Sequence, residues 1–235
     1  MPGPVVVEAC AKLTVSLRVV GVRADGYHLL DAEMVALDLH DTLVFDPAGS
    51  NDLPPDNLVS RALAAVGRDA RVDLVKRIPA GAGLGGGSAD AAAVLRWARC
   101  SDLGVAAGLG ADVPFCLTGG RARVTGVGEV VMPLPYEERV FTLLTPPRPV
   151  STPAVYAEWD RLDGPVDPRG RNDLEPAALS LFPELAQWRD RLGDVAGARP
   201  TLAGSGGTWF VEGAFEGDGL VVARTVPARE DTGPG

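Results

Sequence analysis

Residues 78–90 read Ile-Pro-Ala-Gly-Ala-Gly-Leu-Gly-Gly-Gly-Ser-Ala-Asp, and this stretch decides the fold of the chain. A strand-like segment over residues 72–78 leads into it, and an alanine-rich segment over residues 89–99 follows as a predicted helix with Ser88 as its N-cap. A glycine loop before a helix exposes backbone N–H groups at the positive end of that helix, and the missing Cβ atoms let an anion approach closely. Five glycines cost more conformational entropy than a tight turn against a sheet would justify. The stretch therefore predicts a phosphate-binding loop.

Two common kinds of phosphate loop do not fit this context. The spacing Gly81-x-Gly83-x-x-Gly86 satisfies the dinucleotide fingerprint, but that fingerprint belongs in the first βαβ unit of a parallel sheet. Here the strands before the loop have the pattern of consecutive antiparallel strands. A Walker loop ends in Gly-Lys-Ser/Thr, and no lysine lies between Lys76 and the C-terminus. The loop therefore points to another kind of phosphate-binding protein.

The remaining pattern predicts an α+β chain of two domains. Strand-like segments of the first half lie at residues 5–9, 13–20, 33–45, 121–125, 129–134 and 140–145, and a helical spacing of apolar residues covers residues 57–66. The run Pro146-Pro147-Arg148-Pro149 excludes helix and central strand, so we expect an N-terminal domain at residues 1–146 and a C-terminal domain at residues 147–235. The second domain has predicted helices at residues 153–162, 174–179 and 183–192 and predicted strands at residues 209–212 and 220–226.

Composition excludes several classes of protein. The chain has 235 residues, a net charge of −9 and no cluster of lysine and arginine, which argues against nucleic acid as a partner. No apolar run approaches the roughly 20 residues of a membrane span, and the N-terminus lacks the pattern of a signal peptide, so we expect a cytoplasmic protein without membrane contact. Cys10, Cys100, Cys116 and the two histidines are too few and too scattered for a disulfide framework or a zinc site, so no metal-ligand set is expected.

Lysine is scarce, because Lys12 and Lys76 are the only two among 22 basic residues. Lys76, beside Arg77 at the end of a predicted strand, has the place of an ordinary strand-end charge. Lys12 lies on an apolar-patterned strand, where it is either an edge-strand charge or a lysine of a functional site. Asp112 follows Gly110-Ala111, where an aspartate serves either as a helix cap or as a proton acceptor. Local pattern alone leaves both alternatives open.

Four further segments resemble one known family together with the glycine loop. These are residues 11–13 followed by residues 26–28 (Ala-Lys-Leu and Gly-Tyr-His), residues 109–115 (Leu-Gly-Ala-Asp-Val-Pro-Phe), residues 172–175 (Asn-Asp-Leu-Glu) and residues 202–207 (Leu-Ala-Gly-Ser-Gly-Gly). In this order the chain resembles the GHMP kinase superfamily, in its branch of 4-diphosphocytidyl-2-C-methyl-D-erythritol kinases. The resemblance runs from about residue 9 to residue 212, and several ordered motifs are far more specific than one glycine pattern.

The resemblance implies a two-domain α+β kinase with a mixed α/β N-terminal domain and a smaller, reduced ferredoxin-like C-terminal domain. It implies that ATP, with Mg²⁺, phosphorylates the 2-hydroxyl of a cytidine-diphosphate-linked methylerythritol in the non-mevalonate route to isoprenoid precursors, and that the enzyme is a monomer or homodimer. Lys12 and Asp112 fall on the catalytic pair. The ATP-binding positions are Gly81, Gly83, Leu84, Gly85, Gly86, Gly87 and Ser88, and the substrate-binding positions are Thr14, Tyr27, His28, Thr152 and Tyr156.

The chain also departs from the family pattern. Thr14 stands where the family has asparagine, and Ala89 stands in place of a second serine of the glycine motif. Residues 98–109 are shorter than the family's helix before the aspartate, and residues 212–219 replace a helix between the last strands. One alternative is a GHMP kinase for another small alcohol such as homoserine or mevalonate, which the cytosine-holding Tyr27-His28 pair disfavours. Another is a silent nucleotide-binding module, which the presence of both Lys12 and Asp112 disfavours.

Overall fold

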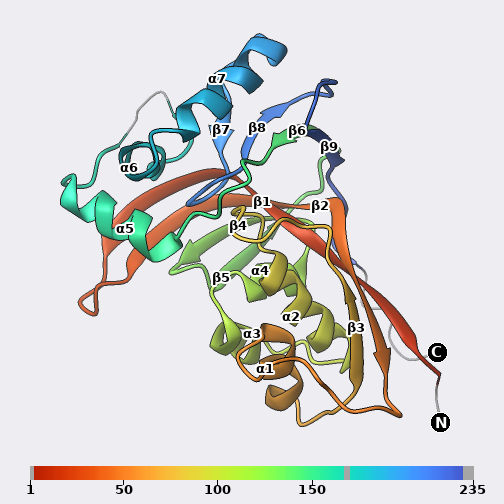
Figure 1. Cartoon of the computed structure of the whole chain (residues 1–235). Helices are drawn as coiled ribbons and strands as arrows, with labels where there is room; N and C mark the ends of the chain where they lie inside the picture. Colours follow the sequence, from red (N-terminus) through yellow and green to blue (C-terminus); the bar gives the residue numbers. More distant parts are fainter. Residues whose placement is uncertain (1–2, 167–169, 230–235) are drawn as a thin grey trace.

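The computed structural model describes residues 3–166 and 170–229 of the chain. Its first sheet is antiparallel and has the order β1-β2-β4-β5, with β3 paired to the far end of β2 (Figure 1). Its strands are β1 (Val5–Val22), β2 (His28–Asp46), β3 (Arg71–Val75), β4 (Arg121–Gly126) and β5 (Val130–Leu134). The sequence predicted two separate strands at residues 5–9 and 13–20, whereas the structure joins them, because pairing with β2 continues across local irregularities.

Those irregularities in β1 decide which side chains face the functional cavity. The register against β2 shifts between Cys10 and Lys12 and again between Thr14 and Ser16. A bulge interrupts the strict alternation of a strand and redirects the side chains beyond it. Lys12, Thr14 and Leu17 accordingly line one cavity, while Ser16 lines a groove elsewhere on the sheet. Lys12 and Thr14 share this face by the ordinary alternation of a strand, and the irregularity after Thr14 turns Leu17 toward the same cavity.

Four helices accompany this sheet, and their ranges are α1 (Leu58–Ala65), α2 (Gly86–Trp97), α3 (Leu103–Leu109) and α4 (Val113–Thr118). Helix α2 is buried on nearly every side, which its alanines allow because small side chains let the sheet, α1 and α4 approach closely. It begins at Gly86 with Gly85 as N-cap, so the prediction of Ser88 as N-cap is wrong. The residue pattern predicted neither α3 nor α4. Helix α3 lies where the family resemblance implied a shortened helix before Asp112.

The second sheet is antiparallel and has the order β7-β8-β6-β9, with β6 (Val140–Leu144), β7 (Thr201–Leu202), β8 (Trp209–Glu212) and β9 (Leu220–Arg224). The sequence assigned the strand at residues 140–145 to the first half, but it pairs with β8 and β9 here. Helices α5 (Thr152–Arg161), α6 (Glu175–Leu181) and α7 (Leu185–Ala196) accompany this sheet (Figure 1). Residues 213–219 form no helix, as the sequence indicated. The boundary between domains stays a prediction.

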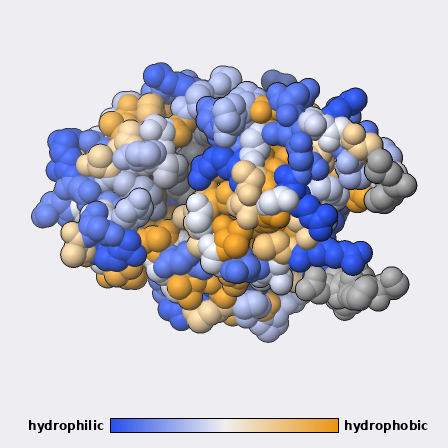
Figure 2. Space-filling view, turned by 90° about the horizontal axis from the view of Figure 1, so that it is seen from below, coloured by the Kyte–Doolittle hydropathy of each residue, from blue (hydrophilic) through white to orange (hydrophobic). Residues whose placement is uncertain are grey.

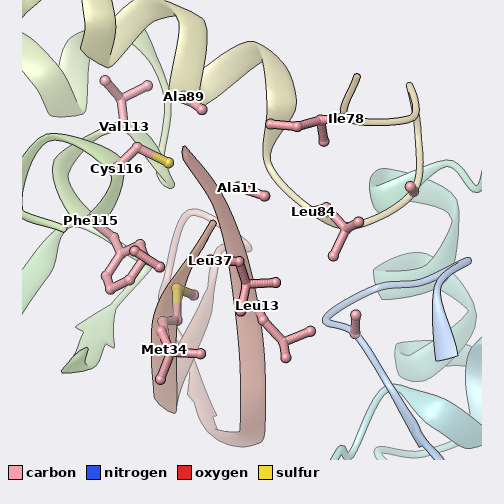
Figure 3. Close-up of a cluster of buried hydrophobic side chains, with 14 of the residues drawn as sticks. Ala11, Leu13, Met34, Leu37, Ile78, Leu84, Ala89, Val113, Phe115 and Cys116 are labelled. Carbon is pink, nitrogen blue, oxygen red and sulfur yellow. The ribbon is translucent and has the colours of Figure 1, made fainter. Parts of the chain in front are cut away.

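One buried cluster joins both halves. Figure 3 shows Leu84 of the glycine loop among the side chains that surround β1, including Ala11 and Leu13. The α+β fold class is confirmed by these two sheets and seven helices in the described part of the chain. The face in Figure 2 carries apolar residues near its centre and hydrophilic ones around them, which agrees with a composition of 46% hydrophobic and 23% charged residues. None of the described helices combines the length and apolar character needed to cross a membrane.

Candidate active site

The glycine loop is held between the two sheets by backbone contacts. The N–H of Lys12 in β1 donates to the carbonyl of Leu84 at 3.0 Å, and the N–H of Thr208 donates to that of Ala82 at 3.1 Å. Gly83 has φ +78, and a Cβ there would lie 2.8 Å from the carbonyl oxygen of Gly206 and would also strike that of Ala203. The second glycine motif therefore packs directly on the first, and only glycine fits this contact.

The loop ends at the N-terminus of α2 with the geometry of an anion site. Gly85, with φ +70, is the N-cap and makes no side-chain capping bond, and Gly86, Gly87 and Ser88 form the first turn. Their N–H groups lack intrahelical partners and lie at the positive end of a twelve-residue helix. Leu84 differs from its neighbours, because its side chain is 1% exposed in the core and offers a ligand only its backbone.

Lys12 and Asp112 meet beside this loop from distant parts of the chain. The Nζ of Lys12 lies 3.3 Å from Oδ2 of Asp112 and donates to Oγ1 of Thr14 at 3.0 Å. The side chain of Lys12 is 7% exposed and that of Asp112 is 33% exposed, so the aspartate remains reachable from the cavity. Asp112 occupies the N-cap position of α4 but caps nothing with its side chain. The carboxylate of Asp112 therefore does not serve as a helix cap, which was one of the two alternatives that the sequence left open.

A cavity of about 730 Å³ surrounds the loop and this pair. Predicted site residues that line it are Lys12, Thr14, Gly81, Gly83, Gly85, Gly86, Gly87, Ser88, Asp112, Thr152 and Tyr156. Leu84, Tyr27 and His28 do not line it. An open groove of the same volume lies elsewhere, among arginine and glutamate side chains of both sheets that are largely paired with one another. We assign the site to the cavity with the glycine loop, because phosphate chemistry needs its free N–H groups.

An aromatic group adjoins the cavity through Tyr156, the one member of the group that lines it. The ring of Tyr156 in α5 lies 4.7 Å from the ring of His28, whose Nε2 is 2.8 Å from Oδ1 of Asp160. Trp159 meets the same histidine edge-on at 5.4 Å. Burial raises the pKa of the Tyr156 phenol well above its usual value, and the nearby charge of Asp112 raises it further. Tyr156 thus lies near Asp112 while its ring packs on His28.

Tyr27 is the outermost residue of this aromatic group. It is 60% exposed, and the guanidinium of Arg23 lies 5.4 Å from the centre of its ring. An exposed aromatic ring is available to stack on a planar ligand. The tip of the hairpin between β1 and β2, which carries Tyr27, lies beside α5 in Figure 1.

The C-terminal glycine motif forms another part of the cavity wall. Gly204 and Ser205 line the cavity, and the hydroxyls of Ser205 and Thr152 are 2.7 Å apart. Buried Asn172 donates to the carbonyls of Leu202 at 2.8 Å and Gly204 at 2.6 Å. The sequence left open whether this motif is a turn or part of the pocket, and the structure shows that it is both.

Sequence reasoning missed a charged cluster at the base of α2. The Nζ of Lys76 pairs with Asp41 and lies 2.6 Å from Oδ2 of Asp90. Burial would lower the pKa of Lys76, but its hydrogen bonds to the two aspartates outweigh burial and raise it. Burial raises the pKa of Asp90 to about 6 against the opposing effect of Lys76. The sequence predicts an ordinary strand-end charge at Lys76, although the scarcity of lysine and the position just before the loop are signals for the cavity that it lines.

Side-chain oxygen atoms that can coordinate a metal ion belong to residues that line this cavity. Oδ1 of Asp90 is buried without a hydrogen-bond partner among the described residues. Carboxylate and hydroxyl oxygens are the ligands that Mg²⁺ prefers, usually together with substrate phosphates. Asp90 and Ser88, both on α2 and both lining the cavity, therefore fit a magnesium ion bound mainly through phosphate.

Comparisons with known proteins agree with this site. The family described as GHMP kinases N terminal domain matches residues 57–120. The 4-diphosphocytidyl-2-C-methyl-D-erythritol kinase of Paracoccus denitrificans (strain Pd 1222) is 41% identical over 231 residues, which cover 86% of this chain and 84% of that protein. The kinase of the same name from Cereibacter sphaeroides (strain ATCC 17029 / ATH 2.4.9) is 37% identical and covers 94% of each chain.

Solved structures agree with the sequences. A crystal structure of 4-(cytidine 5'-diphospho)-2C-methyl-D-erythritol kinase matches with a TM-score of 0.77 at 32% identity, over 94% of this chain and 98% of that one. A homoserine kinase from Cytophaga hutchinsonii matches with a TM-score of 0.58 at 18% identity, which shows a shared fold alone. The two curated kinases and the crystal structure of the same name match this chain over most of its length, and the chain has the glycine loop with the lysine and aspartate beside it. The chain therefore belongs to the family of 4-diphosphocytidyl-2-C-methyl-D-erythritol kinases within the GHMP kinases.

Proposed function

We propose that this chain transfers the γ-phosphoryl group of ATP to the 2-hydroxyl of 4-diphosphocytidyl-2-C-methyl-D-erythritol, a step of the non-mevalonate route to isoprenoid precursors. The observation that carries the proposal is the pairing of Lys12 and Asp112 at 3.3 Å beside the glycine loop. A cation and a proton acceptor next to a phosphate cradle are the groups that phosphoryl transfer to an alcohol needs. The chain is a small-molecule kinase, and we further expect it to work in the cytoplasm as a monomer or homodimer.

In the proposed reaction Asp112 accepts the proton of the substrate hydroxyl. Its carboxylate has no capping bond to give up, and its one-third exposure lets a hydroxyl approach from the cavity. Lys12 donates hydrogen bonds to the developing alkoxide and to equatorial phosphoryl oxygens. Thr14 accepts from Lys12 and so holds the ammonium group in place. Because the transition state is loose, these residues act by position and charge rather than by covalent chemistry.

The nucleotide phosphates bind the first turn of α2 in this proposal. The N–H groups of Gly86, Gly87 and Ser88 donate to phosphate oxygens, and Gly85 leaves room for the stem of Lys12, which lies 2.7 Å from a Cβ built on that glycine. When bound, Mg²⁺ neutralises charge on the phosphates. Ser88 and Asp90 are the residues we propose to hold it.

The base of the alcohol substrate is proposed to bind at the aromatic wall. Tyr27 and Tyr156 offer stacking faces, and His28 offers a hydrogen bond to the edge of cytosine. Thr152 borders the same cavity and is placed to contact the substrate near Ser205. Homoserine and mevalonate have no base to fill this wall, which disfavours them as substrates.

The test is a panel of alcohols, each incubated with the protein and ATP, with turnover measured as ADP release. We expect turnover with the cytidylyl alcohol and turnover at least about 100-fold lower with homoserine and mevalonate, because the base contributes stacking and hydrogen bonds that these alcohols lack. Asp112→Asn is the control for contaminating kinases. If homoserine or mevalonate is the preferred substrate, the chain is a GHMP kinase for another small alcohol and the proposal is wrong. If ATP binds but no alcohol is phosphorylated, the chain is a silent nucleotide-binding module.

A further inference from the structure

Asn172 is buried at the junction of β1 and the second glycine motif, and its amide makes three hydrogen bonds to backbone groups. The residue is 1% exposed. Its Nδ2 donates to the carbonyl oxygens of Leu202 at 2.8 Å and Gly204 at 2.6 Å, and its Oδ1 accepts from the N–H of Leu174 at 2.9 Å. Carbonyl oxygens only accept and an N–H only donates, so these partners fix the orientation of the amide.

The segment that carries Asn172 is anchored to β1, the strand that also carries the lysine of the site. The N–H of Leu17 donates to the carbonyl of Arg171 at 2.8 Å, and the N–H of Asp173 donates to that of Leu17 at 3.0 Å. The buried carboxylate of Asp173 also pairs with Arg18 of β1 at 2.6 Å. The backbone around Asn172 therefore has a fixed position relative to β1, and its side chain extends this anchor to the second glycine motif.

The backbone at Gly204 in turn borders the polar atoms of the site. A Cβ built on Gly204 would be in van der Waals contact with both Nζ of Lys12 and Oγ1 of Thr14, at 3.5 Å from each. The same Nζ donates to Thr14 at 3.0 Å and lies 3.3 Å from Asp112. The contacts run from β1 through Asn172 to Gly204 and back to Lys12 on β1. Asn172 therefore determines how closely the second glycine motif approaches Lys12.

We propose that Asn172 is a positioning residue that holds the backbone of Gly204 against Lys12 and thereby keeps the ammonium group in place for phosphoryl transfer. The inference rests on the proposed function, in which Lys12 stabilises charge in the transition state. Such stabilisation depends on groups that are fixed before the reaction, and a gap beside the ammonium would let it move. A misplacement of about 1 Å can cost about 100-fold in rate. Asn172 touches no substrate and acts through Gly204.

The first experiment compares Asn172→Ala with a matched loss of an amide elsewhere. Asn172→Ala leaves the carbonyls of Leu202 and Gly204 without this donor. Asn51→Ala is the control, because Nδ2 of Asn51 donates to Oγ of Ser60 at 2.8 Å but Asn51 does not line the cavity. We expect Asn172→Ala to lower kcat about 10- to 100-fold with the Kd for ATP within about threefold of the wild-type value, and Asn51→Ala to change neither.

Two results of this experiment would overturn the inference. If kcat of Asn172→Ala equals that of the wild type, the amide serves stability alone, even where the melting temperature falls. If ATP affinity is lost at unchanged kcat, the amide acts through the nucleotide site rather than through Lys12. Asn172→Ser, which keeps a polar group on a shorter side chain, replaces the alanine variant if that variant does not fold, and its kcat should fall in the same direction.

The second experiment asks whether Asn172 acts through the lysine. Lys12→Met removes the ammonium group that Asn172 is proposed to hold in place. In this background Asn172→Ala should lower kcat by less than about twofold, because two changes that remove the same interaction are not additive. A fall by the same factor in both backgrounds would show that Asn172 acts independently of Lys12 and would overturn the inference.

The placement of Lys12 can also be measured without turnover. Lys12 and Lys76 are the only lysines, so a protein labelled with ¹³C in lysine gives two sets of side-chain NMR signals, which Lys12→Met assigns. The side chain of Lys12 is 7% exposed and hydrogen-bonded, so its two ε protons should have separate shifts in the wild type and converge in Asn172→Ala. The signals of Lys76, which Asp41 and Asp90 hold, should stay unchanged. Unchanged Lys12 signals in Asn172→Ala would overturn the inference.

These outcomes separate the inference from the proposed function. A wild type that phosphorylates the cytidylyl alcohol, with a kcat that survives Asn172→Ala, leaves the function intact and overturns the role of Asn172. A wild type that phosphorylates no alcohol overturns the function, while the NMR signals of Lys12 still decide whether Asn172 holds this side chain in place.

Discussion

Replacing Asp112 by asparagine tests the proposed chemistry most directly, because it changes the proton acceptor and little else. Asparagine has the same shape, and its amide oxygen can still accept a hydrogen bond from Lys12, which lies 3.3 Å from the carboxylate. It has no useful basicity, so the proton of the substrate hydroxyl loses its acceptor. General-base catalysis typically contributes roughly 10²- to 10⁴-fold, which corresponds to about 3–5 kcal/mol in the barrier.

The expected cost in stability is smaller and can be separated from the loss of rate. Removing one partner of a fully buried ion pair costs about 3–5 kcal/mol. Here solvent screens the pair, since the side chain of Asp112 is 33% exposed, and the amide keeps one hydrogen bond. We therefore expect the free energy of unfolding to fall by about 1–2 kcal/mol, which leaves a typical domain folded. Because the variant stays folded, a loss of turnover of 100-fold or more cannot come from unfolding.

The assay follows ADP release at saturating substrates, with ATP affinity measured separately by titration calorimetry. Turnover should fall into the expected range while the Kd for ATP stays within about threefold of the wild-type value, because the glycine loop is untouched. Turnover of Asp112→Asn within threefold of the wild type would refute the assignment of Asp112 as proton acceptor. A large loss of ATP affinity with unchanged turnover would instead assign this carboxylate to the nucleotide.

Four further predictions address the other parts of the site. Lys12→Met should lower kcat about 100-fold or more, since it removes charge stabilisation in the transition state; a raised KM for ATP as the sole effect would make Lys12 a ground-state ligand. Gly87→Ala should weaken ATP binding about tenfold in calorimetry without unfolding, because its Cβ meets only the flexible Leu58 at 3.3 Å; Gly83→Ala, which meets backbone at φ +78, should instead lower the melting temperature. Tyr156→Ala should raise KM for the cytidylyl substrate about 5- to 150-fold, and unchanged competition by free CMP would contradict this. Burial raises the folded pKa of Asp90 from 3.8 to about 6, so its contribution to the free energy of unfolding falls as pH rises between these values. Asp90→Asn does not titrate, and its stability relative to the wild type should rise by up to about 3 kcal/mol from pH 4 to pH 7, whereas parallel profiles in urea unfolding would contradict the shift.

Most elements of the fold could be predicted because their signals are local. The alternation of β1 and β2, the glycine loop and the alanine-rich α2 are visible within about twenty residues. The partner of β6 is not a local property, and the proline run after it suggested the wrong sheet. The shift of the α2 N-cap from Ser88 to Gly85 arises because Gly85 can adopt φ +70, so a glycine ends the loop where a serine cap was expected.

Two short helices escaped prediction for a different reason. The segment Leu103–Leu109 has seven residues and two internal glycines, which is too short for a helical period to stand out. One local signal existed, because Asp102 caps the helix by accepting from the N–H of Gly104 at 2.7 Å. Helix α4 has a proline at its start, which favours a first helical turn as well as the end of an element. Both helices were therefore ambiguous without the tertiary structure.

Contacts within the site also divide into pairs that the sequence motifs implied and pairs that only the tertiary structure shows. The resemblance implied that Lys12 and Asp112 act together, and the structure brings them within 3.3 Å although 100 positions separate them. Their chemical roles remain predictions. The pairs Lys76 with Asp90 and His28 with Asp160 had no motif of their own. Such pairs follow from how β3, α2 and α5 pack, which residue pattern alone does not determine.

The position of the site between the two sheets explains why both glycine motifs are needed. Lys12 and Asp112 belong to the first half, whereas Thr152, Tyr156 and Ser205 belong to the second. The glycine loop lies between them, fixed to β1 through Leu84 and to Thr208, directly after the second motif, through Ala82. A side chain at Gly83 would push the halves apart and move the lysine and aspartate away from the aromatic wall. In the proposed reaction the close contact of the two motifs aligns the phosphate cradle with the alcohol, and the distance between the reacting groups would depend on a contact that touches neither substrate.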